Sequence, residues 1–134
     1  MKIRRIGIFG IKIRDKRLEQ KVNTYLQVIS KEDSDGLKGI FEIELPPFFD
    51  EDVKACYIPE KKKIFLIKNK WYSENLYHEI GHHVHLKKPE NVNSTEPELE
   101  CFADEYERRK TSEFCNIVYD SPSRNMQNPQ GVGL

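Results

Sequence analysis

The feature that most constrains the fold of this chain is the segment His78-Glu79-Ile80-Gly81-His82, which lies within a cluster of all four histidines. Residues four positions apart share one face of an α-helix, so His78 and His82 can bind the same ion if the segment is helical. Glu79 then lies about 100° round the helix from His78. In this spacing, two imidazoles hold zinc and the glutamate acts as a general base. We therefore expect one Zn²⁺ per chain at His78 and His82, with Glu79 as the catalytic residue.

The other residues of this segment predict its surroundings. His83 and His85 turn away from the face of His78 and His82, so we expect structural roles for them. Gly81 costs a helix about 1 kcal/mol relative to alanine, which indicates that another element approaches closely there. The alternative is a histidine cluster that only packs or faces solvent, but that interpretation leaves Glu79 unexplained.

The pattern of apolar residues predicts an α+β fold, a small mixed β-sheet backed by helices. Alternating or apolar runs predict strands, and apolar residues at helical spacing predict helices. Ile64–Ile67 is expected to form a sheet edge beside the metal, to which an extended peptide can add. The predicted elements are a strand at 3–13, a helix from Asp15 to about Ser30, a strand at 40–45, a hairpin of 53–58 and 63–67, a helix at 74–87 capped by Ser73, and a helix at 96–116 capped by Thr95 with Glu98.

Composition excludes several classes of protein. Lys and Arg (22) balance Asp and Glu (22), so no bulk charge draws the chain onto nucleic acid or an anionic membrane. Its apolar runs are too short for a secretory signal or for the ~20 residues of a membrane helix. Three cysteines without a C-x-x-C spacing indicate reduced thiols. We expect a cytoplasmic protein whose partner is a peptide or protein substrate, with self-association left open.

A catalytic zinc usually has three protein ligands and a water, so a third ligand must come from elsewhere in the chain. An extended metzincin motif would need glycine at 85 and histidine at 88, but these positions are His85 and Lys88. The candidates are the acids at the start of the next predicted helix: Glu96, Glu98, Glu100 and Asp104.

The histidine segment followed by residues 96–103 resembles the gluzincin metallopeptidases, which pair H-E-x-x-H with a downstream E-x-x-A-D/N-x-F-A helix. Similar patterns occur in the catalytic cores of CAAX-type and heat-shock membrane peptidases and in the short latent minigluzincins, and the likeness covers residues 53–104. It implies a zincin-like catalytic domain over residues 1–120, followed by a non-regular tail at 121–134. In that pattern the ligand lies six residues before the phenylalanine, which carries over to Glu96 before Phe102.

The same resemblance gives Glu100 the place of the residue that orients a ligand histidine. The chain departs from the pattern at Leu99, where alanine is usual, and at Pro97, directly after the ligand. Glu100 is the next candidate for the ligand, because Glu100 and Asp104 are four residues apart, as are Glu96 and Glu100. Glu98 comes after it, as a capping-box partner.

The function implied is zinc-dependent hydrolysis of peptide bonds. The resemblance to latent enzymes implies that the tail at 121–134 blocks the cleft, and a mobile end is the alternative. A zinc-binding regulatory or interaction protein with an inactive peptidase fold is the rival function.

Overall fold

Five strands form one mixed sheet in the computed structural model, which describes residues 1–119. In spatial order they are β2 (Lys12–Ile13), β1 (Lys2–Ile6), β3 (Gly39–Ile43), β5 (Lys63–Ile67) and β4 (Ala55–Ile58). The three central strands run parallel, whereas β2 and β4 are antiparallel edge strands. The predicted α+β class with a small mixed sheet is confirmed.

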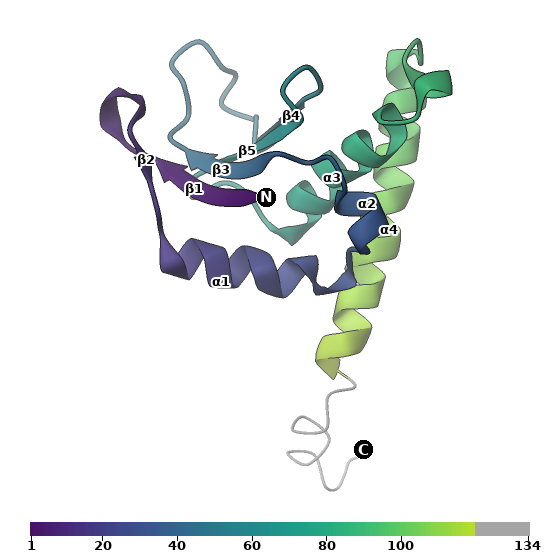
Figure 1. Cartoon of the computed structure of the whole chain (residues 1–134), viewed down its shortest axis with the longest axis horizontal. Coiled ribbons are helices and arrows are strands. Elements are labelled where there is room, and N and C mark those ends of the chain that lie inside the picture. Colours follow the sequence, from purple (N-terminus) through teal and green to yellow (C-terminus); the bar gives the residue numbers. More distant parts are fainter. Residues whose placement is uncertain (120–134) are drawn as a thin grey trace, which may run out of the picture.

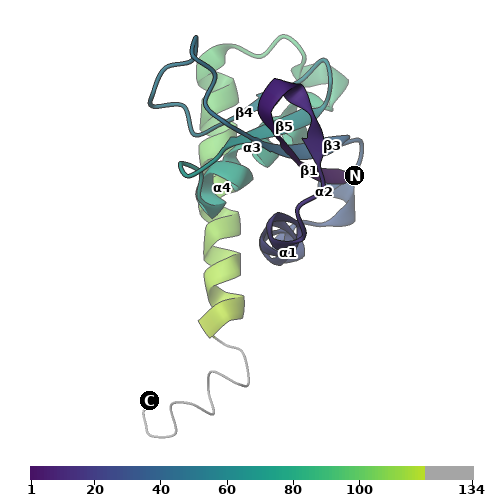
Figure 2. The ribbon, with the colours of Figure 1, turned by 90° about the vertical axis from the view of Figure 1, so that its left-hand side faces the viewer.

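The helices lie beneath and beside this sheet (Figure 1, Figure 2). The first, α1 (Lys16–Tyr25), is capped as expected by Asp15, whose carboxylate accepts hydrogen bonds from the backbone N–H groups of Arg17 and Leu18. None of the helices described is long and apolar enough to cross a membrane. The remaining helices are α2 (Lys31–Ser34), α3 (Ser73–Leu86) and α4 (Glu96–Tyr119), with 3₁₀ turns at Ile8–Gly10, Leu26–Val28 and Pro89–Asn91.

The single strand predicted over residues 3–13 is wrong, because the chain reverses direction within it. Phe9 (φ 67°) and Gly10 (φ 77°) both adopt the left-handed backbone conformation, which lets the chain turn sharply. The reversal pairs β2 antiparallel with β1. Apolar residues recur in both arms of this hairpin and across its turn, so their pattern does not reveal the turn.

The prediction that Ile64–Ile67 forms a sheet edge is also wrong, although the hairpin that contains it is confirmed. This strand, β5, lies between β3 and β4, and Ile64 and Leu66 are fully buried. The strand at the edge is β4, which within residues 1–119 pairs with β5 alone. In β5, Ile64 and Leu66 face the core, whereas Phe65 between them is half-buried.

The tail predicted for residues 121–134 lies outside the described residues. Its expected effect on activity therefore stays a prediction.

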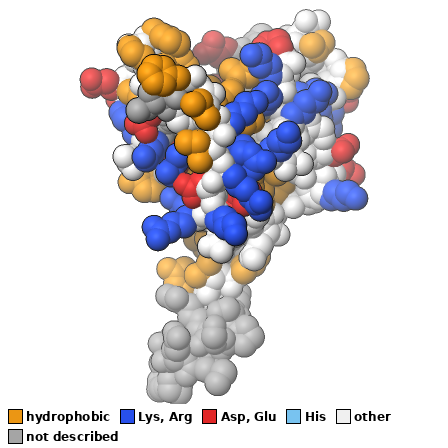
Figure 3. Space-filling view, turned by 60° about the vertical axis from the view of Figure 1, so that its left-hand side comes forward, with side chains coloured by type: hydrophobic (Ala, Val, Ile, Leu, Met, Phe, Trp, Pro, Cys, Tyr) orange, Lys and Arg blue, Asp and Glu red, His pale blue; other side chains and the backbone are white. Residues whose placement is uncertain are grey.

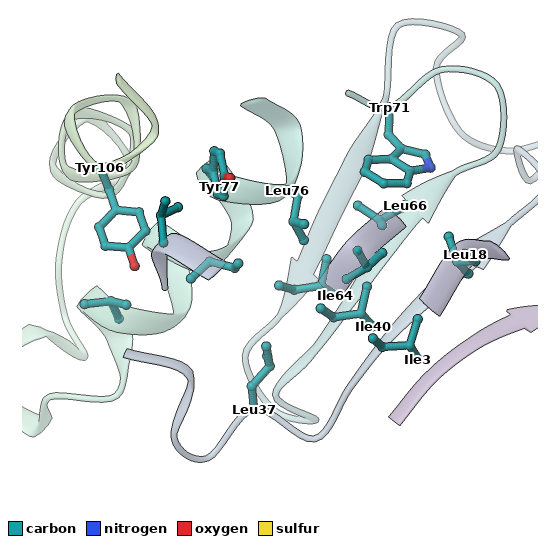
Figure 4. Packing of buried hydrophobic residues seen from close by; sticks show 14 residues of the cluster. Ile3, Leu18, Leu37, Ile40, Ile64, Leu66, Trp71, Leu76, Tyr77 and Tyr106 are labelled. Carbon is teal, nitrogen blue, oxygen red and sulfur yellow. The ribbon is translucent and has the colours of Figure 1, made fainter. Parts of the chain in front are cut away.

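The hydrophobic core lies between the sheet, α1 and α3 (Figure 4). Ile3, Ile40 and Ile64 are aligned in register across the three parallel strands. Leu76 and Ile80 of α3 are completely buried in the same cluster. This packing fixes one face of α3 against the domain and directs the face with the histidines toward α4.

Helix α4 crosses α3 at Gly81, where the two backbones approach most closely. A Cβ atom added at Gly81 would lie 3.1 Å from the Cα atom of Ala103 and 3.1 Å from the Cβ atom of Tyr106. Ala103 is fully buried and Tyr106 nearly so. The expected close approach at Gly81 is thus present, and it fixes which residues of α4 face the histidines.

We expect the substitution Gly81→Ala to destabilise the domain, although alanine favours helices by about 1 kcal/mol. The added methyl group meets the backbone of Ala103 rather than a flexible side chain, and overpacking of this kind costs about 1–3 kcal/mol. Thermal unfolding should show a lower midpoint than the parent, whereas Asn116→Ala on the exposed side of α4 should not. A midpoint raised by Gly81→Ala would contradict the tight crossing.

Candidate metal centre

Helix α3 places His78 and His82 on the same side, as their spacing predicts. The helix begins one residue earlier than expected, because Tyr72 rather than Ser73 is the N-cap, and its backbone N–H donates to Asn75 Oδ1 at 2.8 Å. The two imidazole rings lie 4.8 Å apart between centroids, with an interplanar angle of 84°. Both rings are largely shielded from solvent, with side-chain exposures of 17% and 13%.

The carboxylate of Glu100 in α4 contacts both histidines. One oxygen, Oε1, lies 3.0 Å from His78 Nε2, and the other, Oε2, lies 3.1 Å from His82 Nε2. One carboxylate on α4 therefore bridges the two imidazoles on α3. These are the donor types that zinc prefers in sites with three protein ligands.

The second nitrogen of His78 also has acidic neighbours on α4. Asp104 Oδ1 and Glu107 Oε1 each lie 3.2 Å from His78 Nδ1. A carboxylate at this nitrogen fixes the orientation of the ring and the position of its proton, which is the usual arrangement around a metal-binding histidine. Glu100, Asp104 and Glu107 follow each other at helical spacing, so one face of α4 supplies all three.

Glu79 is buried at the base of this cluster, with only 9% of its surface exposed. Burial raises the pKa of its carboxyl to about 7, although the neighbouring His78 and a hydrogen bond from the Tyr57 backbone amide of β4 act in the opposite direction. Glu79 therefore lies beside His78 and next to the edge strand β4. A carboxyl with a pKa near neutrality can both accept and release a proton.

The pKa values of His78 and His82 are shifted in opposite directions. Burial lowers the pKa of His78, but the carboxylates of Glu79, Glu100 and Glu107 outweigh it, and the net pKa is raised. Burial dominates at His82 and lowers its pKa. A bound cation would replace the protons shared by these groups, because both imidazoles must be neutral to act as ligands.

His83 and His85 take no part in this cluster, in agreement with their predicted orientation. His83 is fully buried, with Nδ1 2.7 Å from the Tyr57 hydroxyl and Nε2 2.7 Å from the Asp35 carbonyl oxygen. His85 Nε2 lies 2.9 Å from the Ser94 hydroxyl. Both rings connect α3 to neighbouring segments.

The structure does not place Glu96 with the two histidines. This residue is the first of α4 and is exposed, one turn before Glu100. It lines a cavity that His82 also borders, but within residues 1–119 it makes no ion pair with either ring. The crossing at Gly81 and Ala103 explains the difference, because Glu100 is one turn before Ala103 and Glu96 is two turns before it. The predicted capping box of Thr95 and Glu98 is present.

The prediction placed Glu100 second to Glu96 as the ligand. Reading the gluzincin pattern from Glu100 places Ala103 at the first alanine and Asp104 at the acidic position, with Tyr106 in place of the phenylalanine and Glu107 in place of the second alanine. Reading it from Glu96 requires Leu99 at the position of the first alanine.

Comparisons of the chain with known protein families, curated proteins and solved structures find no match.

Ligand atoms of His78, Glu79 and His82 lie within 4.8 Å of one another, which is close enough to hold one metal ion. We expect His78→Ala and His82→Ala each to weaken zinc binding by at least about 100-fold, the upper range for losing a partner that only orients a ligand. Competition with a chromophoric chelator measures the affinity. His85→Ala, on the same helix, is the matched control, and undiminished zinc affinity in both test variants would exclude this site.

The third ligand can be tested separately on α4. Glu100→Ala should weaken zinc binding by at least about 100-fold, whereas Asp104→Ala should weaken it by about 10–100-fold. Glu96→Ala removes a carboxylate one turn before Glu100 and should leave the zinc affinity nearly unchanged. If Glu96→Ala weakened zinc binding more than Glu100→Ala, the third ligand would be Glu96, as inferred from the sequence.

Proposed function

We propose that this chain is a zinc metallopeptidase whose metal is held by His78, His82 and Glu100. The observation that carries the proposal is the carboxylate of Glu100, which meets Nε2 of both histidines at 3.0 and 3.1 Å. These residues fit the donor set of a catalytic zinc, which has three protein ligands and keeps one position for water or substrate. A bound zinc ion would supply the polarisation of the carbonyl group and of the attacking water.

Glu79 is the residue proposed to move the proton. It takes a proton from the attacking water and passes it to the leaving amine, which requires a pKa near the working pH. Its burial beside His78 supports this role, because burial raises the pKa of the carboxyl to about 7. Asp104 and Glu107 hold the ring of His78 through Nδ1, so that Nε2 points toward Glu100.

Within residues 1–119 no second strand pairs with β4, and this edge supports a peptide as the substrate, although the backbone amide of Tyr57 there already donates to Glu79. An extended peptide can add to an exposed strand through main-chain hydrogen bonds, and its side chains then enter neighbouring pockets. A cavity of about 430 Å³ lies on one side of the histidines, lined by Ala55, His78 and Glu79 among others. A second, of about 260 Å³, lies on the other side and is lined by Tyr57, His82 and Leu99 among others.

The gluzincin pattern is compatible with this proposal, because Glu100 and Asp104 occupy the ligand and orienting positions when the pattern is read in the register that the structure suggests. The rival function, a zinc-binding regulatory protein with an inactive peptidase fold, shares the metal site. The two functions differ only in turnover, so an experiment must separate metal binding from hydrolysis.

We expect Glu79→Gln to abolish peptidase activity while zinc content and thermal stability stay close to those of the parent. Glutamine keeps the shape of the side chain but cannot accept the proton of the attacking water. Cleavage of an unfolded casein by the zinc-loaded full chain is the assay. Glu74→Gln, an exposed glutamate on the same helix, is the matched control and should retain activity.

Two results would contradict this proposal. Cleavage that survives in Glu79→Gln would remove Glu79 from the mechanism. Absence of cleavage by the zinc-loaded parent on a range of unfolded substrates would favour the regulatory function.

A further inference from the structure

A cavity of about 370 Å³ lies between α1 and the connection from β5 to α3. It shares no lining residue with the two cavities that border the histidines, so it is separate from the metal centre. Four cationic side chains line it: Arg5 from β1, Arg17 and Lys21 from α1, and Lys68 after β5. Figure 3 shows that Lys and Arg side chains crowd one side of the molecule, although the chain as a whole has no net charge.

Several charged and polar groups at this cavity are hydrogen-bonded to one another. Glu42, with 6% of its surface exposed, accepts hydrogen bonds from Arg5 Nε and Nη2 through one oxygen and from Trp71 Nε1 through the other. Arg5 Nη1 also contacts Asp15 Oδ2 at 3.0 Å. The charges of Arg5 and Glu42 therefore neutralise each other. Within residues 1–119, Arg17, Lys21 and Lys68 have no buried carboxylate as a partner.

Arg17, Lys21 and Lys68 all line this cavity. Arg17 and Lys21 lie one turn apart on α1, and within residues 1–119 neither has a carboxylate at ion-pair distance. Lys21 Nζ lies over the ring of Trp71, 4.4 Å from its centroid, which holds the ammonium group at the cavity. Within residues 1–119, the ion pair of Lys68 is with Glu44, at 3.7 Å, and the side chain of Glu44 is 71% exposed. Such an exposed ion pair is weak and easily exchanged for another anion.

We propose that this cavity binds a small phosphate monoester, with its phosphate group held by Arg17, Lys21 and Lys68. A phosphate dianion carries two charges and several acceptor oxygens, which match three converging cations better than the single charge of a carboxylate. The volume of about 370 Å³ falls within the range of small-molecule sites. The aromatic ring of Tyr72 also lines the cavity, so the organic part of the ligand has an apolar surface beside it.

The single tryptophan of the chain reports directly on this site, because Trp71 lines the cavity. Titration of the full-length protein with glycerol 3-phosphate should give a saturable change in Trp71 fluorescence. Glycerol and acetate at the same ionic strength are the comparators and should give none. The phosphate affinity should fall as salt is added, because the contacts are electrostatic.

The variant Arg17→Gln/Lys21→Gln should weaken binding of glycerol 3-phosphate at least about tenfold, since hydrogen bonds to charged groups are the strong ones. Lys16→Gln/Lys38→Gln removes two exposed charges outside the cavity and should bind within about twofold of the parent. Lys68→Gln tests the same site from the other side and should also weaken binding, even if the double variant on α1 fails to fold.

The proposal is overturned if the parent shows no saturable response, or if acetate produces the same response as glycerol 3-phosphate. It is also overturned if the cavity variants and the control variant bind equally. Zinc content and casein cleavage of all these variants should match the parent, which keeps this test independent of the metal centre.

Discussion

The candidate site depends on one packing constraint, the crossing of α3 and α4 at Gly81. A residue larger than glycine would crowd this crossing, because an added Cβ atom at position 81 would lie 3.1 Å from the Cα atom of Ala103. That contact fixes the rotation of α4, so the carboxylate one turn before Ala103 reaches both histidines. The hydrophobic core beneath α3 holds the other half of the site, because Leu76 and Ile80 anchor the helix against the sheet.

The electrostatics of the cluster favour a bound cation. Four carboxylates, those of Glu79, Glu100, Asp104 and Glu107, lie around His78 and His82. Burial raises the pKa of the Glu79 carboxyl, and repulsion by the carboxylates of Glu100 and Glu107 acts in the same direction. A divalent ion would offset this repulsion, and as the largest local charge it would dominate the energetics of the site.

The sequence predicts those features that depend on local spacing. Histidines four residues apart, the Asp15 cap and the Thr95 capping box each follow from a few neighbouring residues. The turn at Phe9 and the choice between Glu96 and Glu100 do not. Both acids have the spacing and chemistry of a ligand, and only the rotation of α4 at a contact between distant segments selects one of them. The cationic cavity is likewise assembled from four separate segments of the chain.

The most direct test of the metal centre is anomalous diffraction at the zinc edge from crystals of the zinc-loaded protein. We expect one anomalous peak about 2.0–2.2 Å from His78 Nε2, from His82 Nε2 and from a carboxylate oxygen of Glu100. Glu79 should lie beside the ion without being required as a ligand. A peak at Glu96 instead of Glu100, or no peak between α3 and α4, would contradict the assignment.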